Sequence, residues 1–130
     1  STTDPEIANK LLALALDKDG PLTGRQSSSI VYGLMGSDEF QDMTWDWLKA
    51  NFTQYVTDRV PDVRKGRMPG AGGYFCSLDR RDEVRGFMTE NAEVIPGYER
   101  SLAQTLESIE LCAALRDEKG EELKAALKAR

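Results

Sequence analysis

The stretch from Met43 to Val60, MTWDWLKANFTQYVTDRV, holds both tryptophans of the chain. At about 100° per residue, its apolar residues recur at the helical period and fill two adjoining faces, an arc about 220° wide. The first face consists of Trp45, Leu48, Phe52, Val56 and Val60, and the second of Trp47 and Tyr55. A surface helix needs an apolar stripe only about half as wide. The segment is therefore predicted to be an inner helix that other helices cover on two sides.

Start and stop signals divide the rest of the chain into helices as well, about six in total, and no segment reads as a strand. Thr3-Asp4-Pro5-Glu6 is a capping box, and Thr23 with Gln26 is a second one. Ser77 caps a later helix, and Pro96-Gly97 opens a longer one. The sequence therefore predicts an all-α fold.

Two glycine signals mark breaks between these helices. The stretch from Pro61 to Tyr74, PDVRKGRMPGAGGY, lacks the preceding strand and the Gly-Lys-Ser/Thr pattern of a phosphate-binding loop. We predict a mobile connection there, because glycine and proline disfavour a continuous helix, while Arg64, Lys65 and Arg67 could meet a carboxylate. Gly120 is expected to separate the long helix from a short final one, EELKAALKAR.

Composition limits the function. The 130 residues fit one domain, 1–130, and the net charge of -5 argues against binding to nucleic acid or to an anionic membrane. No apolar run approaches the length of a membrane span. The chain has no histidine, which is the usual general base and the commonest zinc ligand. We therefore expect neither a catalytic nor a metal site within it.

The two cysteines, Cys76 and Cys112, are too few for a zinc site. If the helix after Ser77 and the helix after Pro96 form an antiparallel hairpin, each cysteine lies about 15 residues, or about 22 Å, from the turn. The two are then level, and a disulfide would imply an oxidising compartment, periplasmic or secreted. Two buried thiols in a cytoplasmic protein are the alternative, which the sequence slightly favours.

Four blocks of sequence occur in the order of a known family. Asp4-Pro5-Glu6 precedes an apolar helix, and Arg25-Gln26 opens the next helix. Residues 45–52, WDWLKANF, and residues 102–109, LAQTLESI, carry most of the likeness. Together, over nearly the whole chain, these blocks resemble the C-terminal helical domain of zinc aminopeptidases of the aminopeptidase N and puromycin-sensitive type.

The resemblance implies an α-solenoid of antiparallel helix pairs, similar to HEAT and armadillo repeats, which encloses the peptide chamber of a larger enzyme and limits access to it. In that family the zinc and the general base belong to an H-E-x-x-H helix in a separate domain, and this chain has no such motif. We therefore expect a non-catalytic C-terminal domain without a cofactor, whose parent binds zinc and removes N-terminal residues from peptides. Its partners would be the preceding domains and, through the parent, the peptide.

Two polar residues are candidates for facing the chamber. Asn51 interrupts the second apolar face between Trp47 and Tyr55, so it should bond to nearby backbone or face a cavity. Arg25 is a charged residue at an otherwise small and polar helix start. The aromatic side chains themselves are expected in the core, since they follow the helical period closely.

The first helix has apolar residues on two sides, with Leu12 and Leu16 opposite Leu11 and Leu14. Because a solenoid unit buries one face against each neighbour, we expect Leu12 and Leu16 to be exposed or buried in a homodimer. Two other interpretations of the chain remain open. One is a free-standing helical-repeat module for protein interaction. The other is a small helical enzyme that relies on carboxylates alone, which would need two acids with perturbed pKa values.

Overall fold

The computed structural model describes residues 4–129, and these residues form helices and connections without a strand. The elements, in chain order, are α1 (Pro5–Leu16), α2 (Gly24–Met35), α3 (Gln41–Arg59), the 3-10 segment η1 (Asp62–Gly72), α4 (Leu78–Glu90), the 3-10 turn η2 (Ala92–Val94) and α5 (Glu99–Lys128). The predicted all-helical fold is confirmed.

Most helices begin where the sequence supplies a capping residue. At α2 the Thr23 hydroxyl accepts from the Gln26 N–H at 3.1 Å, and the Gln26 side-chain oxygen accepts from the Thr23 N–H at 2.9 Å. Ser77 caps α4, and Asp4 caps α1 with its carboxylate. The part of the first predicted capping box that falls on Thr3 lies outside the described residues. These caps satisfy N–H groups that have no partner within the helix.

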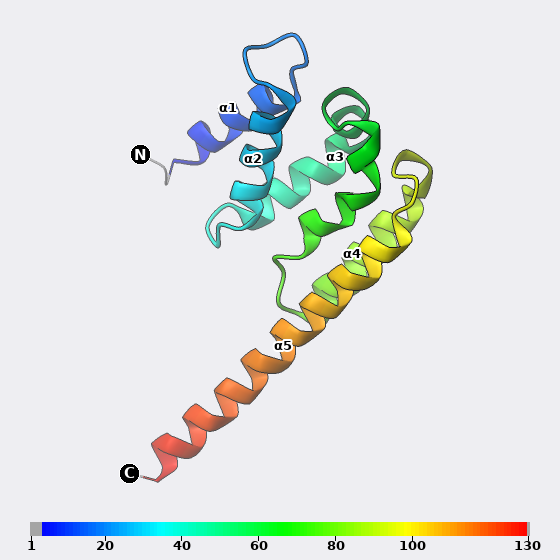
Figure 1. The fold of residues 1–130 in the computed structure, drawn as a ribbon. Helices are drawn as coiled ribbons and strands as arrows, with labels where there is room; N and C mark the ends of the chain where they lie inside the picture. Colours follow the sequence, from blue (N-terminus) through cyan, green and yellow to red (C-terminus); the bar gives the residue numbers. More distant parts are fainter. Residues whose placement is uncertain (1–3, 130) are drawn as a thin grey trace.

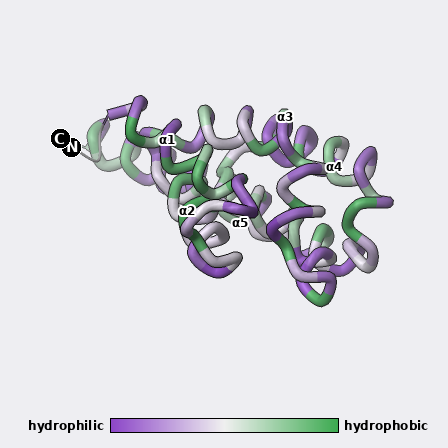
Figure 2. Tube along the Cα trace, turned by 90° about the horizontal axis from the view of Figure 1, so that it is seen from above, coloured by the Kyte–Doolittle hydropathy of each residue, from purple (hydrophilic) through white to green (hydrophobic). Residues whose placement is uncertain are grey.

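The helices pack in two groups (Figure 1). In the first group α1 packs on α2 and α3, and α2 packs on α3. In the second group α4 and α5 run side by side, joined by η2 and by Gly97, whose φ of 80° lies in the left-handed region that glycine adopts freely. The segment η1 contacts α2, α4 and α5 and so connects the groups. Hydrophobic and hydrophilic residues are mixed along each helix (Figure 2).

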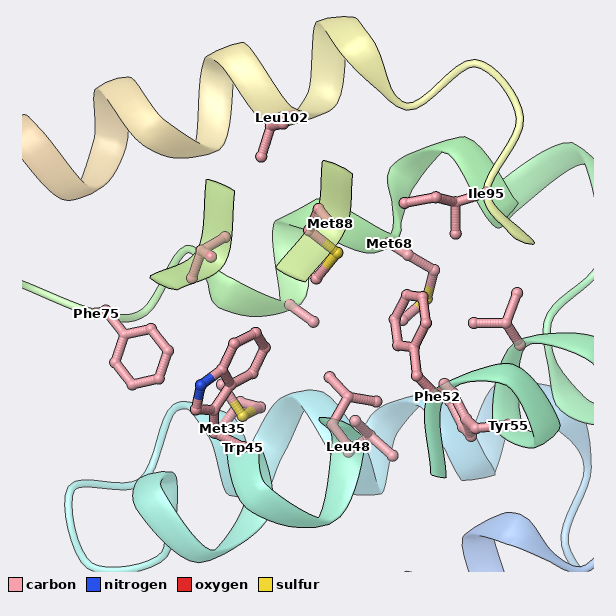
Figure 3. Close-up of a cluster of buried hydrophobic side chains, with 14 of the residues drawn as sticks. Met35, Trp45, Leu48, Phe52, Tyr55, Met68, Phe75, Met88, Ile95 and Leu102 are labelled. Carbon is pink, nitrogen blue, oxygen red and sulfur yellow. The ribbon is translucent and has the colours of Figure 1, made fainter. Parts of the chain in front are cut away.

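The aromatic helix α3 lies at the centre of the core (Figure 3). Trp45 is fully buried, and its ring meets Phe75 and Phe87 edge-on at centroid distances of 5.6 and 5.5 Å. Phe52 meets Phe87 in the same way at 4.9 Å. Pairs of this geometry add about 0.5–1.5 kcal/mol each beyond the area they bury. The prediction that the aromatic side chains of this helix serve packing is confirmed.

The face of α1 that stays open is not the predicted one. Leu12 is fully buried, and Leu16 is partly buried against the same core. Ile7 and Leu14, on the other side of the helix, are each 38% exposed. The prediction for Leu12 and Leu16 was wrong because α2 and α3 pack on that side of α1. Periodicity identified two apolar faces but could not assign a neighbour to each.

The connection between α3 and α4 is helical and packed, contrary to the prediction of a mobile loop. Residues 62–72 form η1, and Met68 is buried in the core. A Cβ on Gly66 would lie 2.8 Å from the Pro96 carbonyl oxygen, and a Cβ on Gly72 would lie 2.8 Å from a valine methyl of α4. The two glycines therefore allow close approach between chain segments.

The separate final helix predicted after Gly120 does not form. Helix α5 is continuous over 30 residues, from Glu99 to Lys128. One glycine inside a helix costs about 1 kcal/mol relative to alanine, and strong helix formers on both sides outweigh that cost. The described residues therefore form five α-helices and two 3-10 segments.

Candidate functional site

A cavity of about 530 Å³ lies at the first turn of α2, beside the end of α3 and the start of η1. Four arginines line this cavity, which we call the arginine pocket, and no Asp or Glu of the described residues lines it. Its charged and polar lining consists of Arg25, Arg59, Arg64, Arg67, Ser28, Tyr32 and Tyr55. The first turn of α2 adds the partial positive charge of a helix N-terminus. The arginine pocket is therefore strongly electropositive.

Arg59 ties the end of α3 to the loop between α1 and α2. Its Nε donates to the Ala15 carbonyl at 3.0 Å. One of its Nη atoms donates to the carbonyls of Leu22 at 2.6 Å and Thr23 at 3.1 Å. These bonds satisfy one backbone carbonyl near the end of α1 and two just before α2, and they hold the guanidinium beside the start of α2. Arg59 is thus a positioning residue as well as a source of charge.

The other three arginines, Arg25, Arg64 and Arg67, are exposed. None of them forms an ion pair within residues 4–129. A guanidinium group presents a planar fork of N–H donors that matches a carboxylate or a phosphate. Three such groups around one cavity can therefore hold an anion by charge-assisted hydrogen bonds.

The two tyrosines of the arginine pocket remain neutral. Burial raises the pKa of Tyr32 well above its usual range. Burial also raises the pKa of Tyr55, although hydrogen bonding with Ser27 and Ser28 partly opposes that rise. Both phenols can therefore supply a hydrogen bond without adding negative charge beside the arginines.

Sequence reasoning found part of this site. Arg25, Arg64 and Arg67 all line the arginine pocket, whereas Lys65 forms an ion pair with Asp62 at 2.8 Å. The role of Arg59 was missed, because a charged residue at the end of a helix most often serves the helix dipole. Its contacts with residues 37 and 44 positions earlier leave no local signal in the sequence.

Asn51 lies apart from the arginine pocket. Its Nδ2 donates to the Trp47 carbonyl at 2.9 Å, one turn earlier on α3. It also lines a polar hollow of about 480 Å³ with Gln54 and Asp58. The structure thus gives Asn51 a backbone bond and a cavity. That Asn51 and Arg25 face a substrate chamber stays a prediction.

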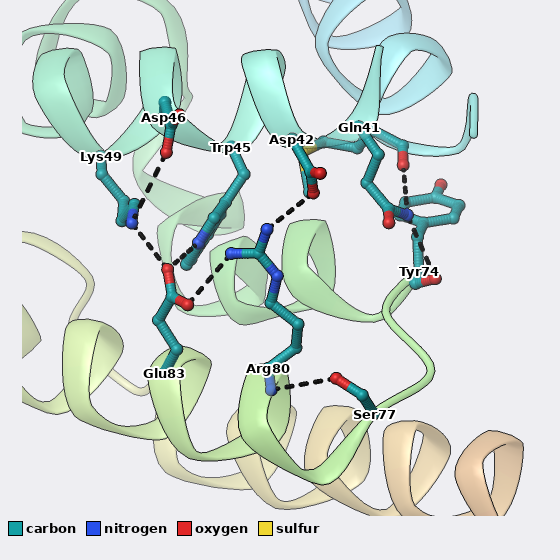
Figure 4. Close-up of polar contacts among 10 residues, drawn as sticks. Gln41, Asp42, Trp45, Asp46, Lys49, Tyr74, Ser77, Arg80 and Glu83 are labelled. Atoms are coloured by element: carbon teal, nitrogen blue, oxygen red, sulfur yellow. Dashed lines mark hydrogen bonds and ion pairs between the residues drawn. The ribbon is translucent and has the colours of Figure 1, made fainter. Parts of the chain in front are cut away.

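A charged network that the sequence did not reveal joins α3 to α4 (Figure 4). Glu83 Oε1 accepts from the Trp45 indole N–H at 2.5 Å and from Lys49 at 2.6 Å. Its Oε2 accepts from Arg80 at 3.0 Å, and Arg80 also donates to Asp42 at 2.6 Å. The network therefore orients Trp45, the largest residue of the core, and stabilises the contact between the two helix groups.

The same network should make stability depend on pH. Partial burial would raise the pKa of Glu83, but hydrogen bonds from Lys49 and Trp45 and the charges of Lys49 and Arg80 hold it below its ordinary value. The stabilisation is then fully present above the unfolded pKa of about 4.3 and is lost as the pH falls through the folded value. We expect the free energy of unfolding to fall more between pH 7 and pH 3.5 in the wild type than in Glu83→Gln. Urea titrations at both pH values measure this difference, and equal falls would contradict it.

Cys76 and Cys112 are joined by a disulfide, with their Cα atoms 5.0 Å apart. The bond links the residue before the Ser77 cap to the middle of α5, close to where that helix leaves the body. It closes a hairpin of α4 and α5, as the level positions of the two cysteines allow. The structure thus has the bonded form in place of the two thiols that the sequence slightly favoured.

Two kinds of site are absent from residues 4–129. No group of three or more His, Cys, Asp and Glu side chains there is arranged to hold a metal ion. No helix formed by these residues has both the length and the apolar character needed to cross a membrane.

Comparison with known proteins assigns the family. The model of the ERAP1-like C-terminal domain matches residues 1–111, which is most of the chain. No curated protein and no solved structure matches the chain. The family match agrees with the resemblance drawn from WDWLKANF and LAQTLESI. The chain therefore belongs to the ERAP1-like C-terminal domain family, the C-terminal domain of the M1 aminopeptidases.

Proposed function

We propose that the chain is the non-catalytic C-terminal end of a zinc aminopeptidase and that its helices enclose part of the chamber that holds the peptide. The family match over residues 1–111 carries this proposal. The absence of histidine from the sequence supports it, because a zinc aminopeptidase site needs ligands of that kind. Zinc, general base and nucleophilic water would belong to a preceding domain of the parent.

The open face of α1 supports contact with a preceding helix of the parent. Ile7, Leu11 and Leu14 follow one another at the spacing of a helix face, and Ile7 and Leu14 are the more exposed members. A repeat unit presents such a face to the unit before it, since each unit buries one side against each neighbour. The α-solenoid arrangement is part of the same proposal.

The arginine pocket supports a role in holding the peptide. We propose that this pocket binds a carboxylate of the substrate, either at the peptide C-terminus or on an acidic side chain. Arg25, Arg64 and Arg67, which have no acid partner among residues 4–129, surround a cavity large enough for such a group. Binding there would position the far end of the peptide while its N-terminus occupies the catalytic domain.

The disulfide between Cys76 and Cys112 supports a parent that folds in an oxidising compartment. Stable disulfides are rare in cytoplasmic proteins, where thiols are kept reduced. We therefore propose a periplasmic or secreted parent.

Steady-state kinetics of the parent protein test the role of the arginine pocket. The variant carries Arg25→Gln, Arg64→Gln and Arg67→Gln together. For a peptide with a free C-terminal carboxylate we expect KM to rise about 10-fold or more, since each charge-assisted hydrogen bond contributes about 1.5–3 kcal/mol. For the same peptide with an amidated C-terminus and no acidic residue, KM should stay unchanged, and so should kcat for a single-residue chromogenic amide.

A matched control is Arg85→Gln, which removes an arginine on α4 that pairs with Asp82 outside the pocket. This variant should behave as the wild type with all three substrates. The assignment of the carboxylate is wrong if the free and the amidated peptide have the same KM in the wild type and the same KM in the triple variant. A parent without any aminopeptidase activity would sink the proposed function as a whole.

A further inference from the structure

A second cavity adjoins the arginine pocket at η1. It has a volume of about 490 Å³ and lies between η1 and the first turns of α5. Val63 and Arg67 line both cavities, so the two are neighbours that share a wall. On α5, Arg100, Ser101 and Gln104 supply the polar lining. We call this second cavity the Arg100 pocket.

Close packing of η1 against the turn before α5 brings the two arginines of this cavity together. A Cβ on Gly66 would lie 2.8 Å from the Pro96 carbonyl oxygen, so the absence of a side chain there allows the approach. The Ser101 hydroxyl donates to the Arg67 carbonyl at 3.5 Å and links the same two segments. Arg67 and Arg100 therefore line one cavity although they are far apart in the sequence.

The charge of the Arg100 pocket suits a single carboxylate. Arg67 and Arg100 are exposed, and neither forms an ion pair within residues 4–129. Among the described residues Asp62 is the one acid in the lining, and it is already paired with Lys65 at 2.8 Å. The two guanidinium groups exceed this acid by one positive charge, which matches a carboxylate better than a doubly charged phosphate.

We propose that the Arg100 pocket binds an acidic side chain of a peptide whose C-terminal carboxylate occupies the arginine pocket. This assignment rests on the proposed function, which gives the first cavity a carboxylate of the peptide. Arg67 lines both cavities, and its fork of separate N–H groups can donate to both carboxylates. Because the cavities share a wall, the acidic side chain belongs to one of the last two residues of the peptide. The substrate class is therefore a peptide with an acidic C-terminal end.

Titration of the 130-residue chain with peptides, followed by NMR of its backbone N–H groups, tests the proposal. The probes are acetyl-Ala-Glu-Glu and acetyl-Ala-Gln-Gln, each with a free and with an amidated C-terminus. We expect the free Glu peptide to bind about 10-fold more tightly than the free Gln peptide, the usual effect of one charge-assisted hydrogen bond. The N–H signals of Arg100 and Ser101 should shift with the Glu peptides only.

Single arginine variants separate the two cavities. Arg100 lines only the Arg100 pocket, so Arg100→Gln should abolish the preference for Glu over Gln and leave the affinity for the free Gln peptide unchanged. Arg64 lines only the arginine pocket, so Arg64→Gln should weaken both free peptides by the same factor and keep the preference. Arg116→Gln is the matched control, since this exposed arginine of α5 lines neither cavity, and it should change neither affinity.

The outcomes distinguish this proposal from the one on which it rests. Equal binding of the free Glu and Gln peptides, together with weaker binding of the amidated Gln peptide, overturns the role of the Arg100 pocket alone. So does a preference for Glu that survives in Arg100→Gln or is also lost in Arg116→Gln. Equal binding of the free and amidated Gln peptides overturns the placement of the C-terminal carboxylate in the arginine pocket, and with it both proposals.

Discussion

Replacing Trp45 with alanine is expected to lower the free energy of unfolding by about 3–5 kcal/mol, the usual cost of truncating a buried tryptophan. The side chain is fully buried and contacts Phe75 and Phe87. The substitution would leave a large cavity between α3 and α4 and would also remove the indole N–H that Glu83 accepts. Urea unfolding followed by circular dichroism measures the loss without relying on tryptophan fluorescence.

Trp47→Ala is the matched control for this prediction. Trp47 lies on the same helix but is only partly buried, and its aromatic contact is with Tyr55 at 5.9 Å. We expect it to lower the free energy of unfolding by about 1–2 kcal/mol. Equal losses for Trp45→Ala and Trp47→Ala would show that the core is not centred on Trp45.

Removing the disulfide should have an effect of similar size. The Cys76–Cys112 bond closes a loop with a sequence separation of 36. A loop of this length restricts the unfolded chain by the equivalent of about 3–4 kcal/mol at 25 °C. We expect the double variant Cys76→Ala and Cys112→Ala to be less stable than the wild type by that amount, measured by urea unfolding without reductant.

The control for the disulfide is the reductant itself. Dithiothreitol should lower the unfolding midpoint of the wild type towards that of the double variant and leave the double variant unchanged. Intact mass under denaturing conditions gives an independent check, because reduction adds two hydrogens to a bonded chain. If the reductant changes neither the intact mass nor the unfolding midpoint of the wild type, the disulfide is absent.

The elements that the sequence predicted are those with a local physical cause. Helix α3 could be predicted because its apolar residues keep the helical period for 18 residues, from Met43 to Val60. The starts of α2 and α4 could be predicted because Thr23 and Ser77 satisfy backbone N–H groups within three residues of themselves.

The misplaced elements all involve glycine, which has more than one physical use. In η1, Gly66 and Gly72 permit close packing, whereas the same residues in an exposed loop would permit mobility. In α5, a Cβ added to Gly120 would have no neighbouring heavy atom within 4 Å, so no close packing requires a glycine there. This glycine only weakens a helix that continues through it. Only the surrounding packing distinguishes these cases.

The candidate site was predictable in its residue types but not in its assembly. Arg25, Arg64 and Arg67 attracted notice separately, as a charged helix start and as a basic stretch. Their convergence depends on how the end of α3 docks against the loop before α2, through Arg59. The Glu83 network was invisible for the same reason, since its partners on α3 lie 34 and 38 residues away.

The most direct test of the proposed function is the size and activity of the native polypeptide that contains this sequence. Antibodies raised against the chain would recover it from the source cells for intact-mass and peptidase measurements. We predict a polypeptide much larger than 14.5 kDa that also carries an H-E-x-x-H motif and releases N-terminal residues from peptides in a chelator-sensitive reaction. A native polypeptide of about 14.5 kDa without peptidase activity would contradict the account and favour a free-standing interaction module.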